Sequence, residues 1–146
     1  KKGMVVEVVT VEDASSIDIK SAVYDKKTKK FEVVVENKGR KIAYVDLEIV
    51  DLVLAGEKAT LGAEQQKITA GQKGTFTIKA ALDVSDYENN EKIKVLARYG
   101  EREGILIKTL VREFNLAFKE TNYKPILFII ILAILLWLLL KRRKKR

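Results

Sequence analysis

Apolar and polar residues alternate along several short stretches of the first 118 residues. One face of the clearest early stretch carries Phe31, Val33 and Val35, and the opposite face carries Glu32 and Glu36. Alternation with a period of two is typical of a half-buried β-strand. The side chains that this pattern predicts to face a core are Phe31, Val33, Val35, Val45, Leu47, Ile49, Phe76, Ile78, Ala80, Leu82, Ile93, Val95, Ala97 and Tyr99.

Two further strands are predicted before residue 31. Residues 4–11 are mostly β-branched, which favours a strand, and residues 17–24 alternate between apolar and polar types. One or two short edge strands are expected between residues 51 and 67, a less regular region. Residues 83–91 are expected to form a polar loop.

The final strand is predicted to run to Phe118, with Phe114 on the same face. A hairpin at residues 100–104 precedes it. Ile107 does not share the register of Phe114, so we expect a β-bulge between Ile107 and Leu110. Short strands separated by turns, with no helical period before residue 119, predict an antiparallel β-sandwich. We expect the sandwich over residues 17–118, after an N-terminal strand and linker over residues 1–16.

An uninterrupted apolar run follows, from Ile126 to Leu140. Fifteen helical residues cover about 22 Å, which is less than a hydrocarbon core of about 30 Å. Lys124 and Lys141 can extend the span because long cationic side chains reach from lipid to the headgroups. A buried core helix is the alternative, but such a helix is rarely apolar on every face. The run therefore predicts a transmembrane helix.

The flanks of this helix predict its orientation. Residues 141–146 are all cationic, whereas Lys119 and Lys124 on the other side are partly offset by Glu120. Lys and Arg are enriched on the cytoplasmic side of spans, so we expect a single-pass protein of the cell membrane, with the domain extracellular and the C-terminus cytoplasmic. A nucleic-acid patch or a sorting signal is the alternative reading of the basic segment. The residues expected to anchor the chain at the membrane and its headgroups are Tyr123, Lys124, Trp137, Lys141, Arg142 and Arg143. Residues 119–125 are expected to link the domain to the span.

The charge and composition exclude several classes of function. The six cations of residues 141–146 supply +6 of the formal charge of +8, which leaves little basis for nucleic-acid binding by the folded part. The chain has no Cys and no His, so Ser/His and Cys/His catalytic pairs are excluded. We therefore expect no enzyme and no cofactor. Abundant Lys, Glu and Arg with few amides indicate a hyperthermophilic, archaeal source.

Three carboxylates offer one candidate metal site. Asp83, Asp86 and Glu88 could supply the oxygen ligands that Ca²⁺ prefers, although they lack the spacing of a calcium loop. The alternative is a loop whose Asp and Asn side chains form turns. A second carboxylate pair, Glu101 and Glu103, is expected to be solvated at a hairpin tip.

Two stretches carry a resemblance to a known family. They are FEVVVENKGRKIA, residues 31–43, and ITAGQKGTFTI, residues 68–78. Together they resemble the immunoglobulin-like CARDB-type modules of archaeal and bacterial surface proteins, which are similar in architecture to fibronectin type III domains. The resemblance implies an immunoglobulin-like sandwich that serves adhesion, spacing or assembly. It also leaves room for a tyrosine corner at Tyr87 or Tyr99.

The function expected from these features is a membrane-anchored module for protein–protein interaction or cell-surface assembly. The partners implied are the lipid bilayer and other membrane or surface-layer proteins. The alternative is an accessory single-pass subunit of a larger membrane complex, such as a transporter, a translocation machine or a membrane enzyme.

Overall fold

A computed structural model describes residues 13–120 and 124–145. Eight strands and two helices follow in order: β1 (Ile17–Asp25), β2 (Lys30–Asn37), β3 (Ala43–Leu54), β4 (Glu57–Gly62), β5 (Gln66–Ile68), β6 (Lys73–Lys79), α1 (Val84–Asn89), β7 (Lys92–Gly100), β8 (Lys108–Asn115) and α2 (Lys124–Lys144). The predicted strand over residues 4–11 lies outside the described residues.

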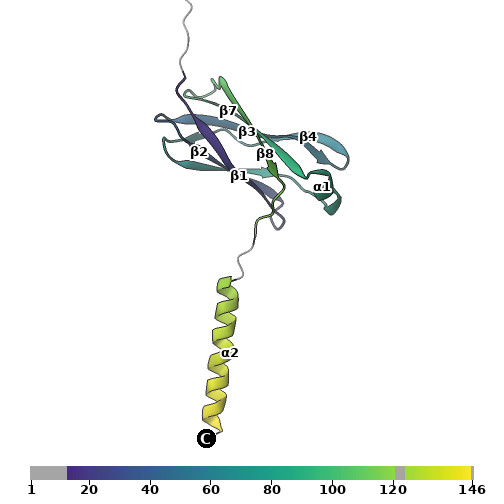
Figure 1. The fold of residues 1–146 in the computed structure, drawn as a ribbon, viewed down its shortest axis with the longest axis vertical. Coiled ribbons are helices and arrows are strands. Elements are labelled where there is room, and N and C mark those ends of the chain that lie inside the picture. The colour runs from purple at the N-terminus through teal and green to yellow at the C-terminus, as the bar shows by residue number, and fades with distance from the viewer. Residues whose placement is uncertain (1–12, 121–123, 146) are drawn as a thin grey trace, which may run out of the picture.

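The strands form two antiparallel sheets (Figure 1). One sheet has the order β1-β2-β6, and the other has the order β4-β3-β7-β8 with β5 also beside β3. In an immunoglobulin sandwich the strands A, B and E share one sheet and C, F and G share the other. Strands β1, β2 and β6 take the first set of places and β3, β7 and β8 the second, which confirms the predicted all-β sandwich class.

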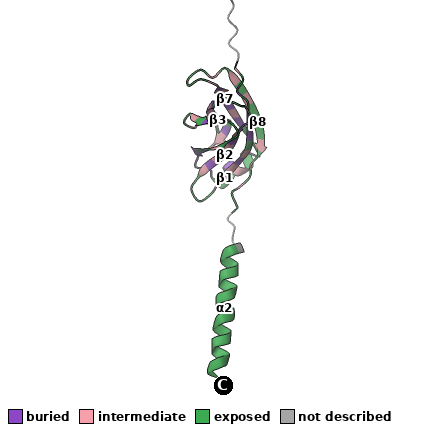
Figure 2. Ribbon diagram, turned by 90° about the vertical axis from the view of Figure 1, so that its left-hand side faces the viewer, coloured by how far each residue is buried: buried purple, intermediate pink, exposed green. Residues whose placement is uncertain are grey.

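Both sheets carry buried residues (Figure 2), and their apolar side chains form one core. Phe31, Phe76, Leu47 and Val95 are all fully buried. The predicted inward faces are confirmed, except that Tyr99, Phe114 and Phe118 are only half-buried. The last strand ends at Asn115 and not at the predicted Phe118. Strand β6 lies at the edge of its sheet, and β2 is central.

Strand β1 contains a bulge that the alternation did not reveal. The register against β2 shifts between Ile19 and Ser21, so that Ala22 and Tyr24 are buried after the shift instead of Ser21 and Val23. A one-residue slip moves every following side chain to the opposite face of a sheet. The bulge therefore delivers Tyr24 into the core.

The bulge predicted before β8 was wrong. Strand β8 pairs with β7 without a register shift, from the pair Lys92↔Asn115 to the pair Tyr99↔Lys108. Ile105 and Ile107 lie outside the strand and are exposed. No bulge is required because these residues belong to the hairpin connection and not to the ladder.

Candidate functional site

Helix α2 is apolar on every side and is not buried by the domain. The stretch Pro125–Lys144 has a mean hydropathy of 2.4 and is 0% buried. Its large apolar side chains are 45–65% exposed. In water this surface would be unfavourable, because each Å² of exposed apolar area costs about 25 cal/mol relative to burial. The helix has the length and composition of a membrane span, as the sequence predicted.

Four of the residues predicted to anchor the chain, Trp137, Lys141, Arg142 and Arg143, lie in the C-terminal part of α2. The Lys141 amine lies 5.0 Å from the centroid of the Trp137 ring, a cation–π distance. Arg142 and Arg143 occupy the last turn, where cations are favoured by the helix dipole. Lys124 begins the helix, and Tyr123 lies outside the described residues.

The chain leaves the domain through a segment that is bonded to β1. The Tyr24 N–H donates to the Ala117 carbonyl at 2.8 Å, and the Lys119 N–H donates to the Tyr24 carbonyl at 2.8 Å. These bonds form a parallel bridge between Tyr24 and Phe118. Residues 116–119, the exit segment, therefore cross from the β8 sheet to the edge of the other sheet before the chain continues to α2.

Aromatic rings hold this exit segment from the side. The Phe118 ring meets the Tyr87 ring edge-on at 4.9 Å and the Tyr24 ring at 6.4 Å. The Lys26 amine lies 4.0 Å from the centroid of the Phe118 ring. The Lys119 amine completes the arrangement with an ion pair to Glu32 at 3.1 Å. Contacts from β1, β2 and α1 thus fix the chain just before the membrane helix.

Tyr24 is the residue in this group that sequence reasoning missed. Its hydroxyl donates to the Ala80 carbonyl at 2.7 Å and accepts from the Leu82 N–H at 3.1 Å. Burial raises the pKa of Tyr24 above its ordinary value. A tyrosine hydroxyl bonded to backbone was predicted for Tyr87 or Tyr99, but the structure assigns that bonding to Tyr24. Tyr24 takes this position because the β1 bulge, which the alternation does not reveal, turns its side chain into the core.

The three candidate metal ligands lie around α1, which replaces the predicted polar loop. Asp86 is buried, and its carboxylate accepts from the Asp83 N–H at 2.9 Å and from the Ala55 N–H at 3.1 Å. Asp83 and Glu88 are exposed. Within the described residues no three carboxylates gather to hold a metal ion. Asp86 instead closes the first turn of α1 and ties it to the end of β3.

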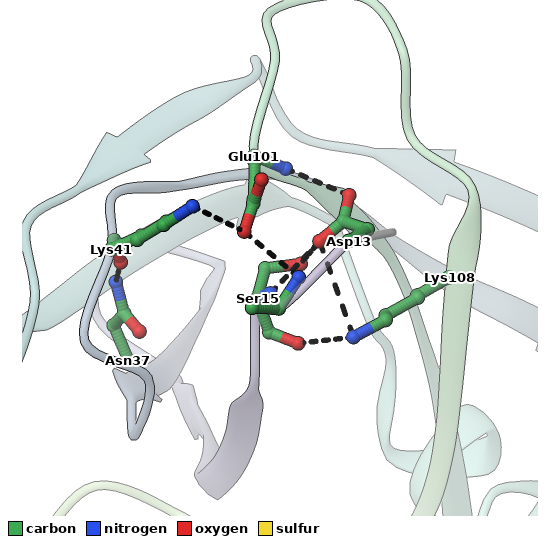
Figure 3. A network of polar contacts seen from close by, with 7 residues as sticks. Asp13, Ser15, Asn37, Lys41, Glu101 and Lys108 are labelled. Carbon is green, nitrogen blue, oxygen red and sulfur yellow. Dashed lines mark hydrogen bonds and ion pairs between the residues drawn. The ribbon is translucent and has the colours of Figure 1, made fainter. Parts of the chain in front are cut away.

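A polar network occupies the opposite end of the sandwich (Figure 3). The Asp13 carboxylate accepts from the Glu101 N–H at 3.0 Å, from the Ser15 N–H at 2.8 Å and from the Ser15 hydroxyl. Lys108 donates to the Ser15 carbonyl at 2.6 Å. The Glu101 carboxylate accepts from the Ala14 N–H at 2.8 Å and pairs with Lys41 at 3.7 Å. This network fastens the start of the described domain to the β7–β8 hairpin.

The role of Glu101 differs from the prediction of a solvated pair. Its side chain is only 20% exposed, because it binds the Ala14 backbone, whereas Glu103 is exposed at the tip. The two carboxylates therefore do not act as a pair. Glu101 is a structural residue.

Replacing Asp13 with Asn should lower the free energy of unfolding by about 2 kcal/mol near neutral pH, because charge-assisted hydrogen bonds contribute about 1.5–3 kcal/mol. Burial by itself raises the pKa of Asp13, but the bonds from Ser15 and Glu101 and the charge of Lys108 hold it below its ordinary value. A lowered folded pKa stabilises the protein above the unfolded pKa of about 3.9, and that stabilisation is lost as pH falls through the folded value.

The difference between wild type and Asp13→Asn should therefore shrink at acidic pH. Urea unfolding in detergent, followed by circular dichroism at neutral and acidic pH, measures it. Glu103→Gln is the control, because Glu103 is exposed on the same hairpin. It should change the free energy of unfolding very little at either pH. A difference for Asp13→Asn that is independent of pH would contradict the charge-assisted role.

No protein-family model matches the chain, and no curated protein matches it. The resemblance to CARDB-type modules therefore stays a prediction. Among solved structures, the ligand-binding region of Serine-glutamate repeat protein A (SgrA) of Enterococcus faecium is 15% identical with a TM-score of 0.45, over 73% of this chain and 99% of that one.

A second similar structure is DesR, a β-glucosidase from Streptomyces venezuelae in complex with D-glucose. It is 15% identical with a TM-score of 0.31, over 68% of this chain but only 15% of the glucosidase chain. At these TM-scores neither likeness bears on what the present chain does. The β-sandwich assignment depends on the strand order and the core described above.

Proposed function

We propose that the chain is a single-pass membrane protein that holds its β-sandwich against the extracytoplasmic face of the cell membrane, as a non-catalytic module for protein–protein interaction or surface assembly. The observation that carries this proposal is the junction. The exit segment is bonded to β1 at Tyr24, and only four residues of chain separate Lys119 from Lys124, the first residue of the apolar helix.

The chain length limits how far the domain can stand from the membrane. The five steps from Lys119 to Lys124 reach at most about 18 Å when the chain is fully extended, and less in any other conformation. A domain held this close to the membrane is better placed to contact partners in the same membrane, or surface-layer neighbours, than soluble ligands. The absence of His and Cys from the sequence supports a non-catalytic role.

Strand β8 supports a binding role for the sandwich itself. It lies at the edge of its sheet, and Val111 on it is exposed, as are Ile105 and Ile107 in the preceding connection. Exposed apolar side chains on an edge strand fit contact with another protein. This observation equally favours the second candidate function, an accessory subunit of a larger membrane complex.

Gentle detergent extraction, size exclusion and mass spectrometry of co-eluting proteins separate the two candidates. A stoichiometric set of multi-spanning proteins supports the accessory-subunit function. Surface-layer material supports the display function. Recovery of the chain alone from fully extracted membranes would contradict a stable complex.

Lengthening the connector tests whether closeness to the membrane matters. Insertion of a dozen Gly and Ser residues after Glu120 should leave the domain folded, because Glu120 lies beyond the bonded exit segment. Recovery of a membrane partner should fall about sixfold, since effective concentration decreases roughly as the −3/2 power of linker length and the linker grows about 3.4-fold.

The matched control is the same insertion after Glu103, at the exposed tip of the β7–β8 hairpin. It adds equal length without changing the distance between domain and span. Quantitative mass spectrometry of the co-purified partner provides the readout. Equal recovery from both insertion variants would remove the argument for membrane-proximal docking.

A further inference from the structure

The turn between β1 and β2 and the first residue of β2 carry four lysines in five residues: Lys26, Lys27, Lys29 and the half-buried Lys30. The Asp25 carboxylate shapes the turn by accepting from the Lys27 N–H at 2.9 Å and from the Thr28 N–H at 3.4 Å. These bonds hold the pKa of Asp25 below its usual range, so it stays ionised while it organises the backbone. We call residues 26–30 the lysine turn.

None of these four lysines has a carboxylate partner in the described part of the chain. No ion pair within 4.0 Å joins Lys27, Lys29 or Lys30 to a described Asp or Glu. Lys26 differs, because its amine lies over the Phe118 ring. Lys26 therefore fastens the turn to the exit segment and leaves the other three amines available.

The lysine turn lies at the end of the sandwich where the chain leaves for the membrane helix (Figure 1). Tyr24, whose backbone N–H and carbonyl both bond to the exit segment, is two residues before Lys26. When α2 spans a bilayer, the chain from Lys119 to Lys124 keeps this end within about 18 Å of the start of the span. Charged groups at this range of distances interact with a charged membrane surface at low salt, where the Debye length is about 10–30 Å.

The same end of the domain also carries carboxylates. Asp83, Glu88 and Glu91 are exposed on and beside α1, which contacts the exit segment through the Tyr87 ring. This carboxylate group adjoins the lysine turn, because the Lys26 amine lies 5.2 Å from the centroid of the Tyr87 ring. A negatively charged surface attracts the lysines and repels the carboxylates, so such a surface would favour a tilt of the domain that brings the lysines closer to it.

We propose that Lys27, Lys29 and Lys30 dock the sandwich on anionic lipid headgroups in the leaflet from which the domain emerges. This inference rests on the membrane attachment proposed above and adds the lipid class and the contacting residues. Each lysine near an anionic surface favours the docked state by about fivefold. The three together shift the ratio of docked to undocked domain by about a hundredfold.

The full chain in lipid nanodiscs provides the test. It has no Cys, so Thr28→Cys introduces a single labelling site on the lysine turn, and Gln72→Cys introduces one at the opposite end of the sandwich. A fluorophore at each site is quenched by spin-labelled headgroups when it approaches the bilayer. The Thr28 label should be quenched more in phosphatidylglycerol nanodiscs than in neutral phosphatidylcholine nanodiscs, and added salt should remove the difference. The Gln72 label should not respond.

The decisive variant is Lys27→Gln, Lys29→Gln and Lys30→Gln combined. It should reduce quenching of the Thr28 label in phosphatidylglycerol nanodiscs to the neutral-lipid level. The matched control removes three exposed cations at the opposite end, Arg40→Gln, Lys67→Gln and Lys73→Gln, and should leave quenching unchanged.

Quenching that is the same in both lipids, or equally reduced by both triple variants, would overturn the lipid contact. Incorporation into nanodiscs is scored first, by co-elution of the chain with the disc. Failure to incorporate would overturn the membrane attachment itself and the lipid contact with it. Normal incorporation without lipid-dependent quenching would overturn the lipid contact alone.

Discussion

Replacing Phe76 with Ala should lower the free energy of unfolding of the domain by about 3–5 kcal/mol, the usual cost of emptying a packed aromatic site. Phe76 is fully buried in β6, where it pairs with Val33 of the central strand β2, itself fully buried. The edge position of β6 does not reduce this effect, because the ring faces the core between the sheets. At about 4 °C or more per kcal/mol, the melting temperature should fall by at least about 12 °C.

Thr77→Ala is the matched control on the same strand. Thr77 is exposed and pairs with Glu32 on the outer face of the sheet, so its replacement should change stability by less than about 1 kcal/mol. Thermal unfolding followed by circular dichroism measures both variants. Equal melting temperatures would show that the register of β6 is wrong.

Alternation predicted the parts of the fold in which one face of a strand is buried and the other is solvated. Strands β2, β3 and β6 were all expected with the correct inward residues, and β7 with all but the half-buried Tyr99, because a period of two leaves little freedom in register. The apolar helix was equally clear, because its run of 15 residues is apolar on every face, which a buried core helix rarely is.

The features that sequence reasoning missed depend on contacts between distant residues. The bulge in β1 follows from its pairing with β2 and from Arg112, which donates to the Ile19 carbonyl at 2.8 Å and pairs with Asp18 at 2.8 Å. Periodicity within one strand contains no information about a partner about 93 residues away. The inward position of Tyr24 follows from the bulge and was missed with it.

Polar residues were the hardest to interpret from sequence. Asp86 and Glu101 were both read as parts of carboxylate groups, yet each accepts hydrogen bonds from backbone N–H groups on a distant segment. A carboxylate that binds a backbone and one that binds a metal look alike in a sequence. The two kinds of carboxylate differ in which group lies next to them, and the folded structure, not the local sequence, determines that group.

The largest functional effect is expected in protease digestion of intact cells, where the segment before α2 should be cleaved and the segment after α2 should be protected. Lys and Arg oppose translocation, and residues 141–146 are all cationic and follow the apolar run directly. On the domain side, the exit segment carries Lys119, which is already paired with Glu32. The imbalance favours a cytoplasmic position for the cationic segment and an external position for the sandwich.

Protease added to intact cells tests this arrangement directly, with one epitope in the β7–β8 hairpin after Glu103 and a second fused after Arg146. Heating to loosen the sandwich before digestion separates protection by folding from protection by the membrane. The proposed topology predicts that the hairpin epitope is destroyed while the epitope after Arg146 survives until the cells are lysed. Survival of the hairpin epitope together with loss of the other, or release of the intact chain by alkaline carbonate, would contradict the proposal that α2 anchors an external β-sandwich.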